Sequence, residues 1–438
     1  MDISVKTGKT YLPKYLVYFQ LIYICFVQLL IGAGLPGSLT LLCDGVNVLL
    51  FICLIWHSGR TISVLSRFKA YYIIVALFFM TGIFSAVFNG INIVLLLWSV
   101  RNFGRFVVFF TAVITFFDMG DFKAMRKIVY VIGHISFVLC VFQFVVLKLK
   151  GDYIGGVFGT NRGVANTWLN TYLVVLYLLA LTEWMYKGKG FARLLIFIAE
   201  VLFVAVVGEL KFFFVELILI TIICIILIKP TLKLVKMELA IIAIGIAAFA
   251  ISIPILYKMF PFFADFFQAK NFFKIASESY TGQGDLGRTT ALFEIAEKIF
   301  FKDPFKVLFG IGLGNGEYSE GQRIFQSAFY LKYKDTNYNW FTDAFVMVET
   351  GFTGVILFAS GFIATGIRSF RIYYHERRNN MALITLVLSF TALMLYIYNI
   401  SLNCEIAYLL YAFLGMGLTG TERSVRITNK TDSKVAYE

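Results

Sequence analysis

Apolar runs of about 20 residues recur along nearly the whole chain and are separated by short polar turns. A helix needs about 20 mainly apolar residues to cross the hydrocarbon core of a bilayer. The pattern therefore predicts an all-α polytopic membrane protein with about twelve transmembrane helices. The predicted spans cover residues 14–32, 38–56, 71–88, 93–117, 127–147, 164–185, 191–207, 210–228, 237–256, 341–365, 382–398 and 403–419.

The composition agrees with this pattern. Of the 438 residues, 59% are hydrophobic, 18% aromatic and only 15% charged, and the mean hydropathy is +0.81. Soluble domains carry about 25% charged residues, so the soluble, disordered and disulfide-scaffold classes are excluded. The six cysteines all lie inside apolar runs, which indicates buried thiols rather than a disulfide framework or a metal cluster.

The distribution of basic residues predicts the topology. The formal net charge is +13. If the amino terminus is cytoplasmic, the inner loops hold more than half of the 39 lysine and arginine residues, as expected when cations are poorly translocated. The excess charge is thus explained by topology, and we expect no nucleic-acid partner. Both termini are predicted to be cytoplasmic, and the first apolar run lacks the small-residue cleavage site of a signal peptide.

One long outer segment divides the chain. Residues 1–256 are expected to hold nine transmembrane helices, residues 257–340 a large outer loop, residues 341–419 three more helices, and residues 420–438 a cytoplasmic tail. In the loop, Leu292, Ile295 and Ile299 recur at helical spacing and predict an amphipathic helix on the protein or bilayer surface. A phenylalanine-rich run at 260–273 suits either the headgroup boundary or packing on the bundle.

Several outer cations are candidates for binding a phosphate group. Arg101 and Arg105 lie four residues apart on one helical face and could grip a phosphate together, or could instead extend to the interface. Lys211 lies in the tight turn between the seventh and eighth spans, where a local ion pair with Glu209 is the structural alternative. Arg323, in the outer loop, is a further candidate.

Arginines also follow two glycine-rich stretches, where main-chain amides can approach an anion closely. Arg162 follows residues 155–161, and Arg288 follows residues 282–287. A third stretch, residues 310–316, follows no parallel strand and lacks a Gly-Lys-Ser/Thr ending, which excludes dinucleotide and P-loop sites. For each stretch, a plain turn is the structural alternative.

Asp343 is the candidate catalytic base at the outer mouth of the tenth span. It could take a proton from a sugar hydroxyl while Trp340 stacks on a sugar face, or it could cap the helix. Glu349 follows six residues later and joins the candidate substrate-binding residues. Because no Asp-x-Asp element occurs anywhere in the sequence, we expect a reaction without metal or other cofactor.

Four segments in this order resemble the O-antigen polymerase and ligase superfamily of bacterial envelope glycosyltransferases. They are Gly156-Val157-Phe158 through Asn161, Gly208 through Lys211, Gly287-Arg288 through Leu292 leading into Phe309 to Gly312, and Thr342-Asp343 through Gly351 to Gly354. The resemblance covers roughly residues 150–365. Ligase-like members often carry Ser-Arg where this chain has Leu210-Lys211, and a His-Asn pair near the tenth span where this chain has no histidine. The polymerase branch therefore fits better.

The resemblance implies a GT-C-like glycosyltransferase fold with a large periplasmic loop between helices 9 and 10, in a bacterial inner membrane. It implies polymerisation of undecaprenyl-diphosphate-linked repeat units of O-antigen or a similar polysaccharide, with inversion. Arg288 and Lys211 fall where members bind the diphosphate, and membrane lipids and a chain-length regulator are the expected partners. The alternatives are ligase-type transfer to another acceptor, or a lipid-linked glycan flippase or secondary transporter, for which twelve spans are equally ordinary.

Overall fold

The computed structural model describes residues 11–187, 190–228, 285–319, 322–375 and 379–419, together with positions 243, 247, 250 and 254. Within these residues the regular secondary structure is helical. Nine of the described helical segments are long and apolar enough to cross a membrane, which confirms a polytopic membrane protein. Apart from positions 243, 247, 250 and 254, the predicted span at 237–256 lies outside the described residues, as does the phenylalanine-rich run at 260–273.

The described spans follow the predicted ones closely. They are α1 (Tyr11–Gly32), α2 (Leu42–Trp56, preceded by a 3-10 turn at Gly37–Leu41), α4 (Lys69–Phe88), α5 (Ile93–Phe116), α6 (Met119–Val145), α7 (Asn170–Lys187, preceded by a π-helical turn at Ala165–Leu169), α9 (Lys211–Ile228), α16 (Thr342–His375) and α17 (Asn380–Tyr398).

Two predicted spans form shorter helices. The run at 191–207 is α8 (Phe191–Val207), with 17 residues, and the run at 403–419 contains α18 (Ala407–Thr419), with 13. At 1.5 Å per residue these helices are about 25 and 20 Å long, less than a hydrocarbon core of about 30 Å. Twelve full-length spans are therefore not found among the described residues.

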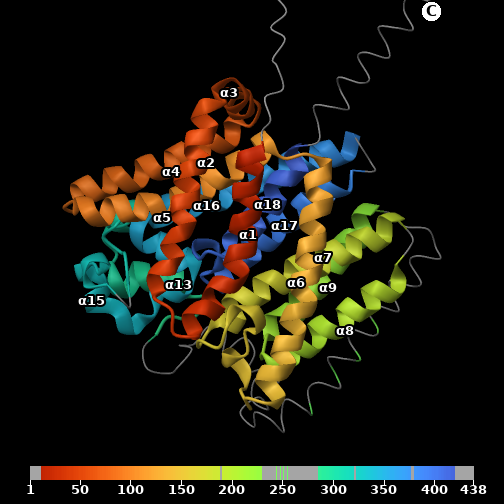
Figure 1. Cartoon of the computed structure of the whole chain (residues 1–438). Coiled ribbons are helices and arrows are strands. Elements are labelled where there is room, and N and C mark those ends of the chain that lie inside the picture. The colour runs from red at the N-terminus through yellow and green to blue at the C-terminus, as the bar shows by residue number, and fades with distance from the viewer. Residues whose placement is uncertain are drawn as a thin grey trace, which may run out of the picture.

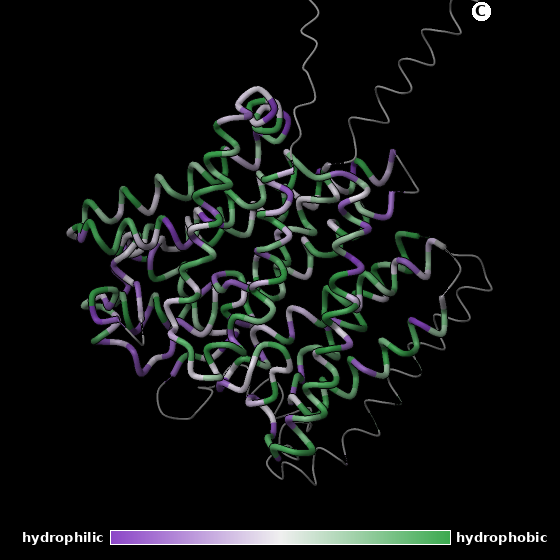
Figure 2. The backbone as a smooth tube through the Cα atoms, viewed as in Figure 1, coloured by the Kyte–Doolittle hydropathy of each residue, from purple (hydrophilic) through white to green (hydrophobic). Residues whose placement is uncertain are grey.

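Helices α7, α17 and α18 form the centre of the bundle (Figure 1). Helix α17 packs between α16 and α18, and α18 also packs on α5, while α7 contacts α8, α9 and α17. In the segment Ala165–Tyr186, 89% of the most apolar window is buried, against 22% for α4. Hydrophobic positions predominate along the helices (Figure 2), and many large hydrophobic side chains of α2 and α4 are exposed, as expected where lipid covers the sides.

The two ends of the bundle differ in how much chain they carry. One end, which we call the α3 end, carries α3 (Ser58–Arg67), and there Lys14 pairs with Asp118 and Asp121 at 3.0 and 2.6 Å. The opposite end, the loop end, carries the connections after α6, α8 and α17. It also carries residues 285–341, with α13 (Ala291–Glu294), α14 (Pro304–Phe309) and α15 (Ala328–Tyr333).

The amphipathic helix predicted around residues 292–300 is present as α13 and a π-helical turn at Ile295–Ile299. Ile295 and Ile299 are buried, and Lys298 on the opposite side is exposed. Because α13 and the turn contact α16, the apolar side faces the protein. Of the two surfaces that the sequence allows, the helix lies on the protein.

Helix α16 is broken at Gly351, and the glycine-rich stretch 310–316, the glycine loop, fills the break. Gly351 has φ +62° and ψ −169°, which interrupts the helical hydrogen bonding. The carbonyls of Val348 and Glu349 accept the amides of Ile311 and Gly312 at 2.9 and 2.8 Å. Gly312 has φ +99°, and a Cβ there would lie 2.2 Å from backbone atoms of Ala86. The loop needs glycine because it packs backbone against backbone.

Candidate functional site

Three predicted cations gather around one carboxylate at the loop end. Burial raises the pKa of Asp152, and three positive charges act on this carboxyl in the opposite direction. These charges belong to Arg162, Lys211 and Arg288, which come from three separate segments of the chain. We call these three side chains with Asp152 the cation cluster.

A hydrogen-bond network joins Asp152, which lies in the α6–α7 connection, to the end of α17. Asp152 lies in the 3-10 turn Gly151–Tyr153 and accepts a hydrogen bond from the side-chain amide of Asn166. The main-chain carbonyl of Asn166 accepts the side-chain amide of Asn399 at 2.8 Å, and the Tyr398 hydroxyl lies 3.4 Å from the Asn166 Oδ1. Segments more than 200 residues apart thus meet at the cluster.

Lys211 enters the cluster from the turn between α8 and α9. Its Nζ lies 3.1 Å from the Glu209 Oε1, so the local ion pair considered from the sequence is present. Glu209 adopts φ +59°, an unusual conformation for a residue other than glycine. Burial raises the pKa of Glu209, and the charge of Lys211 opposes that rise. Lys211 also interacts electrostatically with Arg288 and Asp152, so its role is not confined to the turn.

Arg288 is held over aromatic rings at the edge of the cluster. Its guanidinium carbon lies 4.4 Å from the ring centroid of Tyr398 and 5.9 Å from that of Phe341. Phe212 stacks on Tyr398 with the ring centroids 4.1 Å apart and the planes 14° from parallel. Cation–π contacts of this kind orient a guanidinium without neutralising its charge. Arg288 is half-buried and Arg162 is exposed, so the cluster is accessible from the loop end.

Asp343 lies beneath this surface. The residue is 2% exposed, and its Oδ1 accepts the amide of Ala344 at 2.8 Å within the first turn of α16. The preceding Thr342 donates its amide and hydroxyl to the Asn399 carbonyl at 3.0 and 2.7 Å. Trp340 is 38% exposed, nearer the surface. The first turn of α16 is thus joined to the cluster through Asn399, and Asp343 also interacts electrostatically with Tyr396 of α17.

Arg101 and Arg105 are each paired with a carboxylate from another part of the bundle. Arg101 binds Asp44 of α2 through two nitrogens, with its Nε 2.9 Å from Oδ1. Arg105 is 6% exposed, and its Nη1 lies 3.0 Å from the Glu405 Oε1. These pairs connect α5 to α2 and to the segment before α18. The charge of Asp44 also acts on Arg105, so the two arginines lie near one another, each already paired with a carboxylate.

Arg323 also lies apart from the cluster. It begins a 3-10 turn at Arg323–Phe325 and is exposed. The ring of Phe325, at the end of this turn, stacks on Trp98 of α5 with the centroids 3.8 Å apart. The turn is therefore fixed against α5, beside Arg101, whose guanidinium carbon lies 4.3 Å from the Trp98 ring.

Glu349 is enclosed with Glu317 beneath the glycine loop. The Glu349 side chain is fully buried; its Oε1 accepts the Gly314 amide at 2.8 Å and its Oε2 accepts the Ser99 hydroxyl at 2.6 Å. Glu317 is 1% exposed and accepts the side-chain amide of Asn102 at 2.8 Å. Burial raises the pKa of Glu317. We call Glu317 and Glu349 the carboxyl pair; it supports the loop from inside.

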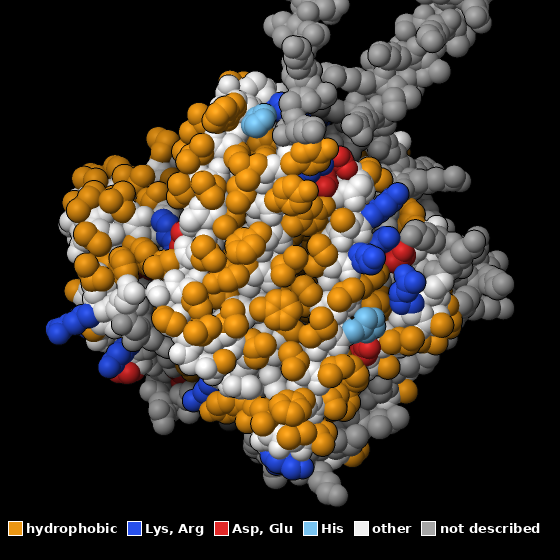
Figure 3. Space-filling model, in the orientation of Figure 1, with side chains coloured by type: hydrophobic (Ala, Val, Ile, Leu, Met, Phe, Trp, Pro, Cys, Tyr) orange, Lys and Arg blue, Asp and Glu red, His pale blue; other side chains and the backbone are white. Residues whose placement is uncertain are grey.

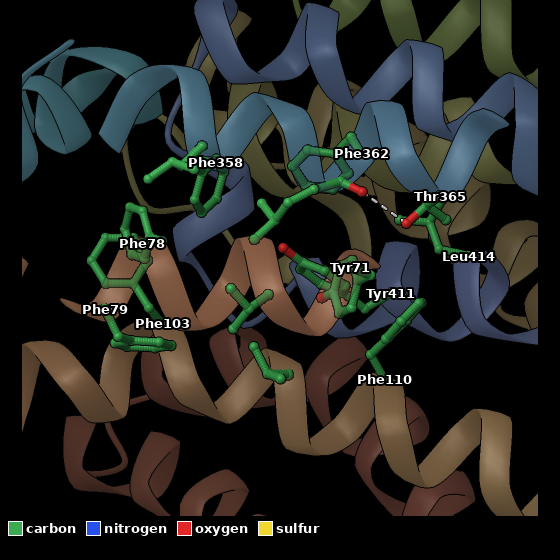
Figure 4. A pocket seen from close by; sticks show the side chains of 15 residues that line it. Tyr71, Phe78, Phe79, Phe103, Phe110, Phe358, Phe362, Thr365, Tyr411 and Leu414 are labelled. Carbon is green, nitrogen blue, oxygen red and sulfur yellow. Dashed lines mark hydrogen bonds between the residues drawn. The ribbon is translucent and has the colours of Figure 1, made fainter. Parts of the chain in front are cut away.

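An aromatic-lined cavity lies elsewhere, between α4, α5, α16 and α18 (Figure 4). Its volume is about 50 Å³, which suits a few water molecules at most and excludes a sugar. The rings of Phe78, Phe103 and Phe358 point into it from different helices. It carries no ionisable carboxylate or cation in its lining. The cavity is a packing feature of the core.

The cluster contains residues that the sequence patterns did not single out. Asp152 stands in a Gly-Asp-Tyr segment just before the glycine-rich stretch 155–161, and Asn166 and Tyr398 lie at the ends of apolar runs. Their polar groups near helix ends were the available signal in the sequence, but Tyr398 lies more than 200 residues from its partner Asn166. Among the residues described, no group of three or more His, Cys, Asp or Glu side chains could hold a metal ion.

Comparison of the chain with models of known protein families gives no match, and comparison with curated protein sequences gives no significant match.

Proposed function

We propose that this protein is a membrane glycosyltransferase that polymerises lipid-linked oligosaccharide repeat units, and that the cation cluster binds the diphosphate of the lipid carrier. The observation that carries the proposal is the gathering of Arg162, Lys211 and Arg288 around Asp152. A diphosphate carries several negative charges, and arginine matches phosphate oxygens bidentately. The resemblance to the O-antigen polymerases rests on segments that include Lys211 and Arg288, and Arg162 directly follows the first of those segments.

The proposed setting is a bacterial inner membrane with both termini in the cytoplasm and the loop end in the periplasm. In this topology residues 237–256 supply a further span, α8 and α18 complete the count of twelve, and the architecture is of the GT-C kind. The lysines and arginines predicted for the inner loops support this orientation.

The proposed reaction is a single displacement at the anomeric carbon. The bond from that carbon to the diphosphate oxygen breaks, a bond to the acceptor hydroxyl oxygen forms, and the configuration inverts. Negative charge grows on the departing diphosphate, where the fixed charges of Arg288 and Lys211 lower the barrier. Asp343 takes the proton of the acceptor hydroxyl. Because Asp343 is 2% exposed, this step requires the first turn of α16 to open toward the acceptor.

The test uses purified full-length protein and a synthetic undecaprenyl-diphosphate oligosaccharide, with products measured by mass spectrometry. We expect masses that rise in whole repeat units, and we expect activity to survive a chelator. Arg288→Ala should abolish elongation, whereas Lys334→Ala removes an exposed charge at the same end and should leave it intact.

Four outcomes would contradict the proposal. Unchanged elongation by both Arg288→Ala and Asp343→Asn would remove the site assignment. Strict dependence on added manganese or magnesium would contradict the metal-free reaction. Transfer of glycan to a different acceptor would instead identify a ligase, and flux of the lipid-linked glycan through liposomes without bond formation would identify a carrier.

A further inference from the structure

A second polar site lies toward the α3 end, in a groove between α6, α7 and α8. The groove has a volume of about 450 Å³ and adjoins a second cavity of about 200 Å³. Both cavities are lined by Tyr130, Glu183 and Arg193. In Figure 3, a group of Lys and Arg side chains lies beside a histidine and an acidic residue on this side of the molecule. Nothing in the proposed reaction uses these groups.

The mouth of the groove is strongly cationic. Its lining includes Lys123, Arg126, Lys127 and Arg193. Arg126 is committed to Glu183, with 3.1 Å between Nη2 and Oε1, and Tyr130 donates to the other oxygen of Glu183 at 3.0 Å. Arg193 lies 3.9 Å from the same carboxylate and is 62% exposed. The lysines are also exposed, so the groove presents several positive charges around one carboxylate. Such a surface attracts a phosphate group.

The groove also contains an ionisable pair at a depth where lipid would be expected. His134 follows Lys127 by seven residues, and Glu200 follows Arg193 by seven, which places the pair about 10 Å further along the helices. The His134 Nδ1 lies 2.8 Å from the Glu200 Oε1, and the histidine side chain is 48% exposed. Ionisable groups inside membrane spans usually face a cavity or a partner. His134 and Glu200 pair with each other, and the exposed part of His134, which lines the groove, presents a polar group to the groove at this depth.

The groove opens sideways onto the surface that meets lipid. Val131, Ile135 and Val138 continue the same side of α6 and are 49%, 41% and 62% exposed. An occupant with a phosphate at the mouth, polar atoms about 10 Å deeper and apolar chains along α6 has the chemistry of a phospholipid. A free phosphate would satisfy only the mouth.

We propose that this groove is a binding site for an anionic phospholipid. Its phosphate contacts Lys127 and Arg193, its glycerol ester oxygens lie toward His134, and its acyl chains pack along Val131 and Val138. A basic surface near the membrane gains about 1 kcal/mol per cation from anionic lipid. The additional carboxylate–histidine pair distinguishes this groove from basic residues that only set the topology.

The test measures lipid binding to the purified full-length protein by native mass spectrometry and by the shift in melting temperature. Phosphatidylglycerol should bind and raise the melting temperature, and phosphatidylcholine should do so weakly. The double variant Lys127→Gln/Arg193→Gln should weaken phosphatidylglycerol binding about 30-fold, since two cations are lost. The matched control Lys69→Gln/Arg371→Gln removes two exposed charges outside the groove and should bind as the native protein does.

Because Arg193 lies near Glu183, a second variant, Lys123→Gln/Lys127→Gln, tests the same mouth using two exposed lysines. Each variant is first required to keep the lipid-free melting temperature of the native protein. Equal losses in the control and groove variants would overturn the proposal, as would equal binding of phosphatidylcholine. A melting-temperature shift reproduced in full by inorganic phosphate would also overturn it, because the groove would then bind the anion alone.

Discussion

The carboxyl pair and the cation cluster lie at the same end of the molecule, and in the sequence both appear as charged residues beside glycines. In the structure they differ in how their charges are satisfied. The oxygens of Glu349 receive an amide and a hydroxyl of the chain itself, and the pair is sealed beneath the glycine loop. The cluster brings three cations from separate segments to Asp152 and includes exposed Arg162. The first arrangement fixes a loop, whereas the second leaves cationic charge near the surface, where we propose that a ligand binds.

The largest effect is expected from Gly312→Ala, which tests whether the stability of the glycine loop depends on its close backbone packing. A Cβ at this position would lie 2.2 Å from the backbone of Ala86, and φ +99° is strained for any other residue. We expect the free energy of unfolding to fall by about 4 kcal/mol or more, measured by denaturation in detergent. Gly34→Ala is the matched control, because Gly34 shares φ +99° but has open space around it, and about 1 kcal/mol is expected. Equal losses would mean that the close approach is unimportant.

Removing a carboxyl of the pair should have the next largest effect. Glu349→Ala leaves the Gly314 amide and the Ser99 hydroxyl buried without their acceptor. Each unsatisfied group costs about 1–3 kcal/mol, so a loss of about 3 kcal/mol in unfolding free energy is expected. Glu297→Ala serves as the control, because that side chain is 63% exposed at the same end. A stability loss no greater than the control's would argue against a structural role for Glu349.

The cluster should respond in activity rather than in stability. Arg288→Ala is expected to reduce the rate of elongation about 100-fold or more, which is about 2.7 kcal/mol of transition-state stabilisation, with little change in melting temperature. Rates come from the repeat-unit assay and melting temperatures from the same preparation. If the elongation rate and the melting temperature fell together, Arg288 would have a structural role like that of Glu349.

Per pH unit, the smallest expected effect is a pH dependence of stability that originates in the carboxyl pair. Burial holds the pKa of Glu317 above its ordinary value of 4.5, so the folded chain keeps a proton that the unfolded chain releases. This stabilising contribution is complete below pH 4.5 and declines as the pH rises toward the folded pKa, by about 1.4 kcal/mol per unit of difference. Glu317→Gln should flatten the profile between pH 5 and 8 in denaturant titrations. An unchanged slope would show that Glu317 ionises normally.

Most of the long helices could be predicted from the sequence, because an apolar run that crosses a bilayer must be about 20 residues long. The bounds of α5, for instance, are 93–116 against a prediction of 93–117. The break at Gly351 did not follow, because it depends on a loop from elsewhere in the chain that supplies hydrogen bonds to the freed carbonyls. Helix lengths are set locally, whereas interruptions depend on tertiary partners.

The candidate site was predictable in part. The sequence named Arg162, Lys211 and Arg288, since cations in outer turns are conspicuous in an apolar chain. It placed Arg101 and Arg105 in the same group, and nothing local revealed that Asp44 and Glu405 bind them. It also missed Asp152, whose importance depends on neighbours that no spacing rule brings together. The charge of a residue can be read from the sequence, but its partner generally cannot.

The number of residues between Arg288 and the glycine loop is constrained by contacts of this segment with α16. Its far end is anchored where the glycine loop enters the break in α16, and α13 and α14 rest on that same helix in between. Because α14 spans Pro304–Phe309 and packs on α16, inserting or deleting one residue between positions 301 and 309 would move either α14 or Arg288 relative to the glycine loop by about one residue length, roughly 3 Å. The number of residues between Arg288 and the glycine loop therefore sets where the guanidinium lies relative to the break in α16.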